Sequence, residues 1–575
     1  MAKFFIGLVT GVALVFLSLI LIFVALLRFR EKPPQIADNS VLVLRLDGDV
    51  PEKAPVELPD FLGGGRPAMT VTNVWTSLRM AAADSHVKAV VVEPSGLTAG
   101  WAKLEEIRQD LVQFRKSNKP VYAYLRTPNT RDYYVALAAD RIYSGPEEPL
   151  MLKGLRAEMM YFKKTLDKLG ANVEVEHAGK YKDFGDMFTR SDMSPETREV
   201  MTSVVDDLYG NLVAKIAESR KKSAQEVQDI IDQGPFTAKQ ALKAGLVDEL
   251  SFEDEMWGAL KNKLASSGEL VKLSGEKYLK VPPSTVGLQG KSRVALVIGE
   301  GDIVRGGPED NGADESSLTS YGFNKILAQV TNDSSIKAVV VRIDSPGGEV
   351  TASDDIWRQM NLLSKKKPTV ISMSDLAASG GYYMAMTGDP IVAYPGTLTG
   401  SIGVVFGKPN IRGLYEKLGI TKDAIQRGKH ADIDSDYTAL TPEERDKLRQ
   451  GIDESYQEFL SKVATARHHT TSEIDQVAQG RVWLGSQAKE HGLVDELGGL
   501  DTAIDLAKKK ANIPSGEQIT LVTYPPRRNV LDILMKKSQE DMMEAKLSQV
   551  FGKIPFRAWM KGGYLRVMPN WVEIK

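Results

Sequence analysis

Val87-Lys88-Ala89-Val90-Val91-Val92 is a stretch that this chain repeats, and it returns 249 residues later as Ile336-Lys337-Ala338-Val339-Val340-Val341. Such near-continuous apolar runs are typical of strands buried on both faces of a parallel sheet. A second string, Gly245-Leu246-Val247-Asp248-Glu249-Leu250, returns as Gly492-Leu493-Val494-Asp495-Glu496-Leu497. In both halves, strand patterns alternate with helical patterns, which predicts stacked βαβ units. The sequence therefore predicts an α/β protein with two tandem copies of one domain.

Length and composition agree with two domains. The chain has 575 residues, of which 42% are hydrophobic and 26% charged, and a single core rarely serves more than ~250–300 residues. We predict a first copy over residues 40–275, a second copy over 276–525 and a C-terminal extension over 526–575. An amphipathic helix is predicted within this extension, near residues 530–548.

A membrane anchor is predicted at the N-terminus. Residues 4–27 are 24 consecutive uncharged, mostly apolar residues, and a helix of this length exceeds the ~30 Å hydrocarbon core. A cleaved signal peptide is the alternative, but its apolar region is shorter and no Ala-x-Ala site follows here. We therefore predict one transmembrane helix over residues 1–30 and a linker over residues 31–39. The flanking basic residues do not favour an exported body.

Composition also excludes several classes of function. The formal net charge of -2 argues against a general nucleic-acid binder. The absence of cysteine excludes disulfides, thiolate catalysis and cysteine-based metal sites. The six histidines form no His-Glu-x-x-His motif, so a zinc protease is not expected. We expect no metal and no cofactor, and we predict that His177 and His430 are surface residues.

The two copies differ at the turns that follow two of the strands. The second copy has Ser345-Pro346-Gly347-Gly348 and Ala377-Ala378-Ser379-Gly380-Gly381, where the first copy has Gly96-Leu97-Thr98-Ala99 and Thr130. Glycines allow tight turns whose N–H groups face outward, and the start of a helix favours a developing negative charge. An isolated Ser-Gly-Gly is more often an ordinary helix cap. The loss of both turns in one copy indicates instead that the second copy carries chemistry.

These two turns are followed by a third motif, Leu398-Thr399-Gly400-Ser401-Ile402-Gly403-Val404. Together the three motifs make the chain resemble the signal peptide peptidase A (SppA) family in its long, duplicated, membrane-anchored form. The resemblance runs from the anchor to about residue 525 and implies the ClpP/crotonase superfold for both copies. It implies that Ser379 is the nucleophile. It also implies that the general base is the lysine of a Gly-x-Tyr-Lys segment, which Gly179-Lys180-Tyr181-Lys182 matches.

Two lysines of this segment compete for the role of base. Lys180 is repeated in the second copy as Lys429, whereas Lys182 is replaced there by Ala431, so Lys182 is the expected base. A free ammonium has a pKa near ~10.4 and cannot accept a proton at neutral pH. We expect burial between the copies to lower this pKa. A helix predicted over Met159–Leu169 precedes the segment.

The remaining parts of the expected site are a proton path and an oxyanion hole. A neutral lysine could take the proton of Ser379, and an acyl-enzyme would follow, as in other Ser-Lys variants of the catalytic triad. The expected oxyanion donors are the N–H groups of Gly348 and Gly380. Ser401 is expected to hold the lysine by a hydrogen bond.

The resemblance implies a membrane-anchored serine endopeptidase that degrades cleaved signal peptides and similar hydrophobic peptides. It further implies a single-pass protein of the bacterial inner membrane, with a periplasmic catalytic body that forms a homo-oligomer, a tetramer by family precedent. One alternative is a crotonase-like acyl-CoA hydratase or isomerase with a carboxylate base, in which Ser379 would be dispensable. A second alternative is an inert membrane scaffold, against which the intact turns of the second copy argue.

Overall fold

The computed structural model describes residues 34–54, 69–265, 268–307, 317–526, 563–568 and 573–574, with three single positions before residue 34. The anchor predicted over residues 1–30 and the helix predicted near residues 530–548 therefore lie outside the description. Among the residues described, no helix has both the length and the apolar character needed to cross a membrane.

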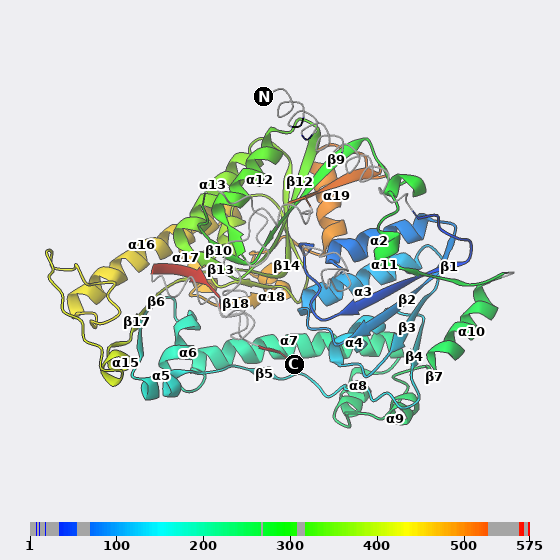
Figure 1. Cartoon of the computed structure of the whole chain (residues 1–575), viewed down its shortest axis with the longest axis horizontal. Coiled ribbons are helices and arrows are strands. Elements are labelled where there is room, and N and C mark those ends of the chain that lie inside the picture. Colours follow the sequence, from blue (N-terminus) through cyan, green and yellow to red (C-terminus); the bar gives the residue numbers. More distant parts are fainter. Residues whose placement is uncertain are drawn as a thin grey trace.

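The first copy is built around a parallel sheet of six strands in the order β7-β4-β3-β2-β1-β8 (Figure 1). The repeated valine run lies in β2, where Val90 and Val91 are fully buried in different hydrophobic clusters. Burial on both faces explains the continuous apolar pattern. The strands are β1 (Ser40–Asp47), β2 (Val87–Ser95), β3 (Val121–Leu125), β4 (Arg141–Ser144), β7 (Glu249–Leu250) and β8 (Val271–Ser274).

The second copy repeats this sheet and confirms the predicted duplication. Its order is β18-β16-β14-β12-β9-β20, with β15 beside β14 and β19 beside β15. In chain order, the strands that correspond to those of the first copy are β9 (Ser292–Glu300), β12 (Ile336–Ser345), β14 (Thr369–Ala378), β15 (Ile391–Ala393), β19 (Glu496–Leu497) and β20 (Ile519–Tyr524). The second copy adds β16 (Leu398–Gly400) and β18 (Val482–Leu484).

The helices of the two copies also correspond in order. The longest pair, α7 (Pro195–Arg220) and α16 (Pro442–Arg467), each begin with a hydroxyl cap followed by proline, a strong start signal. The other pairs are α2 (Val71–Ala83) with α12 (Ser320–Asn332), α3 (Trp101–Arg115) with α13 (Val350–Ser364), α4 (Thr130–Ala136) with α14 (Gly380–Met384), α8 (Ala224–Ile231) with α17 (Thr471–Val477), α9 (Ala238–Lys243) with α18 (Gly485–Glu490), and α10 (Glu253–Leu264) with α19 (Leu500–Lys510).

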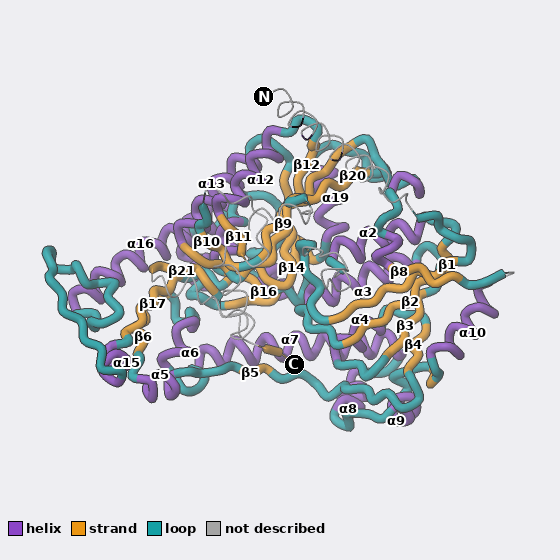
Figure 2. The backbone as a smooth tube through the Cα atoms, viewed as in Figure 1, coloured by secondary structure: helices purple, strands orange, loops and turns teal. Residues whose placement is uncertain are grey.

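A third, mixed sheet joins the two copies to the C-terminal extension. Its order is β11-β10-β13-β21-β17-β6, and Figure 2 shows β21, β17 and β6 near α16. Its first-copy member is β6 (Asn172–Ala178), and its C-terminal member is β21 (Gly563–Val567). The second copy contributes β10 (Asp302–Val304), β11 (Ser317–Thr319), β13 (Gly347–Glu349) and β17 (Val404–Asn410). This sheet carries a first-copy segment into the second copy.

The helix predicted over Met159–Leu169 begins later than the sequence pattern suggests. The structure has β5 (Ala157–Glu158) and then α5 (Lys163–Leu169), which ends at Gly170 in the left-handed conformation. The C-terminal strand β22 (Glu573–Ile574) pairs with β5. Strand β5 ends just before the predicted helix, and residues 159–162 connect it to α5 without helical structure.

Candidate active site

Ser379 lies at the junction of β14 and α14, as the sequence predicts. Its side chain is fully buried, and its backbone has φ 54° and ψ -114°, which is rare for any residue other than glycine. Backbone strain of this kind is concentrated at functional sites. The Ser379 side chain accepts no hydrogen bond from the start of α14. This serine therefore does not act as an ordinary helix cap.

The structure brings Lys182 to Ser379 within one chain. Lys182 Nζ lies 2.8 Å from Ser379 Oγ, and it lies 3.0 Å from both the hydroxyl and the carbonyl oxygen of Ser401. The Lys182 residue is 1% exposed, although it belongs to the first copy and its neighbours belong to the second. Two serines and a lysine that are far apart in sequence thus form one buried group.

Lys180, the competing lysine, lies elsewhere. It is exposed, and its ammonium sits 4.5 Å from the centre of the Tyr181 ring. Its repeat partner Lys429 is also exposed and pairs with Glu443. His177 is exposed, as predicted, and His430 is partly exposed beside Glu443. In the part of the chain that the structure describes, no cluster of three or more histidine or carboxylate groups is arranged to hold a metal ion.

The strand β6 carries Lys182 to the site. It pairs antiparallel with β17, in a register that sets Ala178 opposite Val404. Glu174 and Glu176 lie on one face of β6, because side chains alternate along a strand. They bind Arg445 on α16 at 2.8 and 2.7 Å. These glutamates are buried, so the ion pairs fix β6 on the second copy.

Sequence reasoning did not identify these ion pairs. The signal in the sequence was the alternation Val173-Glu174-Val175-Glu176, together with arginines at positions 445 and 449, one helical turn apart. Arg449 completes the contact with Glu176 at 2.9 Å.

Close backbone packing holds Lys182 in place. Tyr181 N–H donates to the carbonyl of Gln479 at 2.8 Å. A Cβ at Gly480 would lie 2.6 Å from the backbone nitrogen of Lys182 and 2.7 Å from its Cβ, and Gly480 also has a φ of +77°. A side chain at position 480 would therefore push the lysine segment away from Ser379.

Because Lys182 is the base expected from the sequence, Gly480→Ala is expected to lower kcat on the order of 100-fold, the cost of displacing such a group by about 1 Å. The matched control is Gly210→Ala in the middle of α7, where an added Cβ meets nothing within 4 Å. Steady-state peptide hydrolysis and thermal unfolding of both variants test this expectation. Parent-like kcat in Gly480→Ala would contradict it.

The two glycine turns of the second copy lie against each other. A Cβ at Gly381 would lie 2.5 Å from the carbonyl oxygen of Ser345, and Ser345 pairs with Ala377 across the sheet. The Ser345 hydroxyl donates to the carbonyl of Gly301 at 2.7 Å and accepts the N–H of Gly347. The turn that carries Gly348 is therefore held beside the turn that carries Ser379 and Gly380.

The first copy has a carboxylate at the corresponding place. Asp132 is buried and accepts the N–H groups of Gly96, Leu97 and Asn129 at 3.0, 2.9 and 2.9 Å. The outward N–H groups of this turn are thus satisfied by a side chain of the same copy. Its arrangement differs from that of the second copy, as expected from the loss of both glycine turns.

An extended segment from the C-terminus lies along the turn that carries Gly348. Strand β21 pairs antiparallel with β13 on one side and with β17 on the other. Met568 N–H donates to the carbonyl of Pro346 at 2.9 Å. In the register of this pairing, Gly348 lies opposite Arg566. The edges of β13 and β17 therefore accommodate an extended backbone.

Comparison with known families supports the duplicated architecture. The model for peptidase family S49 matches residues 113–266 and 361–514, one match in each copy. The Clp protease family model matches residues 316–398, which agrees with the Clp-like fold expected for the second copy. One solved structure, ClpP1 from Listeria monocytogenes, covers 36% of this chain and 91% of its own, at 16% identity and a TM-score of 0.22.

Curated relatives match most of the chain. Serine protease SPPA, chloroplastic, from Arabidopsis thaliana is 34% identical over 87% of this chain and 73% of its own length. Protease 4 from Salmonella typhi is 33% identical over 80% of this chain and 75% of its own. Protease 4 from Haemophilus influenzae is 30% identical over 87% of this chain and 84% of its own.

Proposed function

Because the chain belongs to peptidase family S49 and is a serine protease, we propose that Ser379 is its nucleophile and that Lys182 is its general base. The observation that carries this proposal is the 2.8 Å distance between Lys182 Nζ and Ser379 Oγ in a fully buried setting. Family membership favours peptide hydrolysis over the acyl-CoA hydratase and the inert scaffold that the sequence left open.

The proposed reaction begins with proton transfer from Ser379 to Lys182. Burial of an amine disfavours its charged form, so the neutral amine can accept the hydroxyl proton. Ser379 Oγ then attacks the peptide carbonyl, the protonated lysine gives its proton to the leaving amine, and an acyl-enzyme remains. Water resolves the acyl-enzyme with Lys182 as base. Ser401 supports this role, since its two oxygens lie 3.0 Å from Nζ and orient the amine.

Gly348 and Gly380 N–H groups are the proposed oxyanion donors. The contact between Gly381 and Ser345 supports this pairing, because it brings the turn that carries Gly348 beside the turn that carries Ser379. A preorganised donor at the developing oxyanion stabilises the transition state by about 3 kcal/mol.

Peptides are proposed to bind as an added strand between β13 and β17. Main-chain hydrogen bonds would supply affinity for any extended peptide, and side-chain pockets would supply preference. The position of β21 supports this mode, since that segment already pairs with both edges.

Deletion of residues 563–575 is expected to lower KM for a peptide by roughly tenfold, because a tethered strand competes at a high effective concentration. Deletion of residues 569–575 is the matched control, since it removes β22 and keeps β21. KM measured for both truncated chains tests the proposed binding mode. Equal KM values in the two deletions would contradict it.

The proposed substrates are cleaved signal peptides and similar hydrophobic peptides, at the periplasmic face of a bacterial inner membrane. The uncharged stretch over residues 4–27 supports an anchor that holds the protease where such peptides arise. The test is cleavage of a fluorogenic signal-sequence peptide and of a polar peptide of equal length by the full-length chain. Equal rates for the two peptides would count against this substrate class.

Extraction with alkaline carbonate tests the anchor. Release of the chain from membranes by this treatment would contradict the anchor.

A homo-oligomer, a tetramer by family precedent, is also proposed. Light scattering of the detergent-solubilised chain tests it, and a monomeric mass across the working concentration range would contradict it.

A further inference from the structure

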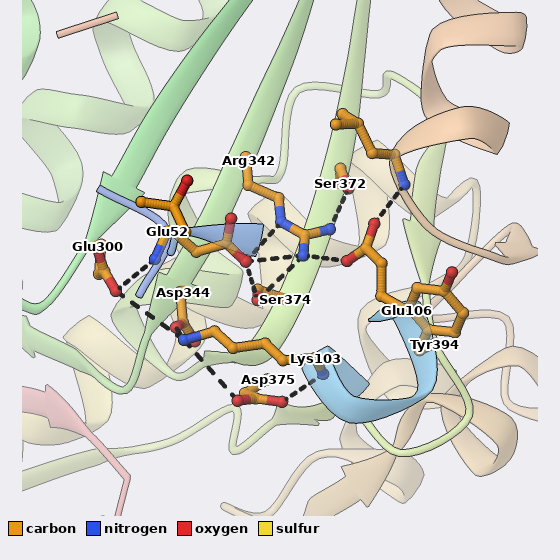
Figure 3. Close-up of polar contacts among 12 residues, drawn as sticks. Glu52, Lys103, Glu106, Glu300, Arg342, Asp344, Ser372, Ser374, Asp375 and Tyr394 are labelled. Carbon is orange, nitrogen blue, oxygen red and sulfur yellow. Dashed lines mark hydrogen bonds and ion pairs between the residues drawn. The ribbon is translucent and has the colours of Figure 1, made fainter. Parts of the chain in front are cut away.

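A buried cluster of charged side chains lies where the two copies meet (Figure 3). Two cations organise this cluster. Arg342 of β12 pairs with Glu52 at 2.8 Å and with Glu106, two acids of the first copy. The second cation, Lys103 of α3, belongs to the first copy and reaches acids of the second copy. Each copy therefore supplies one cation to acids of the other.

The partners of Lys103 lie at the ends of two second-copy strands. Lys103 Nζ is 2.7 Å from Asp344 Oδ2 and 3.9 Å from Asp375 Oδ2, and its side chain is only 4% exposed. Glu300 Oε1 lies farther away, at 4.0 Å. In Figure 3, the Lys103 side chain extends from the start of α3 between Asp344 and Asp375.

Both aspartates adjoin the turns of the candidate active site. Asp344 immediately precedes the Ser345-Pro346-Gly347-Gly348 turn, and Asp375 lies on β14 shortly before Ser379. Asp344 Oδ1 also accepts the N–H of Leu376 at 3.0 Å, which links the two strand ends directly. A single ammonium group therefore contacts both strand ends that carry the proposed nucleophile and one proposed oxyanion donor.

Asp375 also holds the helix that delivers Lys103. Its carboxylate accepts the N–H groups of Gly100 and Lys103, both at 2.8 Å, at the start of α3. These N–H groups have no partner within the helix, and a carboxylate is favourable at this end of the helix dipole. A side chain at Gly100 would collide with the carboxylate, so the approach requires glycine.

None of the three residues of this contact has an equivalent of the same type in the other copy. At the offset of 249 residues that aligns the copies, Lys103 corresponds to Ala352, Asp344 to Ser95 and Asp375 to Arg126. The lysine thus occurs only in the first copy, and its two aspartates occur only in the second. This is the same complementary pattern that Lys182 and Ser379 show.

Lys103 is a fixed cation and not a second proton acceptor. Burial lowers the pKa of Lys103, but the nearby carboxylates raise it by a larger amount. The pKa of Lys103 therefore lies well above its ordinary value. These carboxylates belong to Asp344, Asp375, Glu52 and Glu300. Burial raises the pKa of Asp375 to about 6, and Lys103 opposes that rise. Loss of the ammonium alone would leave buried carboxylates without compensation, which is strongly destabilising.

We propose that Lys103 is a positioning residue for hydrolysis, which sets the turn that carries Ser379 relative to the turn that carries Gly348 by binding Asp344 and Asp375. This inference rests on the proposed roles of Ser379 and Gly348. Lys103 acts on the geometry of the reacting groups and touches no substrate. Its loss should therefore lower kcat and leave KM nearly unchanged.

The test uses a charge-balanced variant, because Lys103→Met alone can unfold the chain. Lys103→Met combined with Asp344→Asn removes one charge of each sign and keeps an oxygen that can accept the N–H of Leu376. The matched control is Lys508→Met on α19, a buried lysine whose Nζ donates to the carbonyl of Glu517, in a contact separate from the site.

Peptide hydrolysis and the rate constant of fluorophosphonate labelling are measured on the full-length chain, alongside Ser379→Ala. We expect kcat and the labelling rate constant of the double variant to fall about 10- to 100-fold with KM within about twofold of the parent. A purely structural role would reduce the fraction of chains that label and would leave the rate constant of the folded chains unchanged.

Two outcomes overturn the inference in distinguishable ways. If hydrolysis by the parent depends on Ser379, and the double variant folds and labels at the parent rate, this inference alone is wrong. If hydrolysis continues undiminished in Ser379→Ala, the proposed function is wrong, and the positioning role of Lys103 is wrong with it.

Discussion

Ser379→Ala is expected to lower kcat for peptide hydrolysis by about 10⁴-fold or more, because the variant lacks the proposed nucleophile and the proposed acyl-enzyme cannot form. KM should change little, since β13 and β17, the proposed peptide-binding edges, are untouched. The measurement is steady-state hydrolysis of a hydrophobic fluorogenic peptide by the full-length chain.

The control for this prediction is Thr130→Ala, a substitution at the first-copy position that aligns with Ser379. Thr130→Ala removes a buried hydroxyl at the place that corresponds to Ser379, and its Oγ1 donates only a long bond of 3.4 Å to the carbonyl of Met151. Its kcat should stay within about twofold of the parent. Equal losses in the two variants would mean that the effect comes from buried hydroxyls in general and not from a nucleophile.

Lys182→Met is expected to lower kcat by about 10³-fold or more, because Lys182 is the proposed acceptor of the Ser379 proton. Methionine has nearly the same length and keeps the buried stem packed. The measurement is steady-state hydrolysis of the same fluorogenic peptide by Lys182→Met and by the parent.

Lys180→Met is the control for the loss of a lysine from the same segment. Lys180 is exposed over Tyr181, so its replacement should leave kcat within about twofold of the parent. A larger loss of kcat in Lys180→Met than in Lys182→Met would mean that Lys180, and not Lys182, is the base. Thermal unfolding of both variants separates a missing base from a general weakening of the fold.

Much of the fold follows from local patterns. The valine run of β2 and its repeat in β12 predict buried parallel strands, because only residues buried on both faces are continuously apolar. The contrast between Lys180, which is repeated, and Lys182, which is not, distinguished the lysine that lies beside Ser379 from the one that lies at the surface. The family resemblance indicated the segment, and comparison of the two copies then chose between its two lysines.

The third sheet could not be predicted in the same way. Pairing of β6 with β17, and of β21 with β13, joins segments that are far apart in sequence, and the partner of an edge strand leaves no local periodic signal. The contacts of Lys103 were missed for a related reason. A lysine in the first turn of α3 reads as a solvated residue until the other copy is placed against it.

The central claim is that the two copies share one active site, with the base on the first and the nucleophile on the second. Fluorophosphonate labelling followed by peptide mapping tests it most directly, on the parent, Lys182→Met and Lys180→Met. We predict a single adduct on Ser379, formed about 100-fold more slowly in Lys182→Met and at the parent rate in Lys180→Met. An adduct on another residue, or parent-rate labelling of Ser379 in Lys182→Met, would contradict the account.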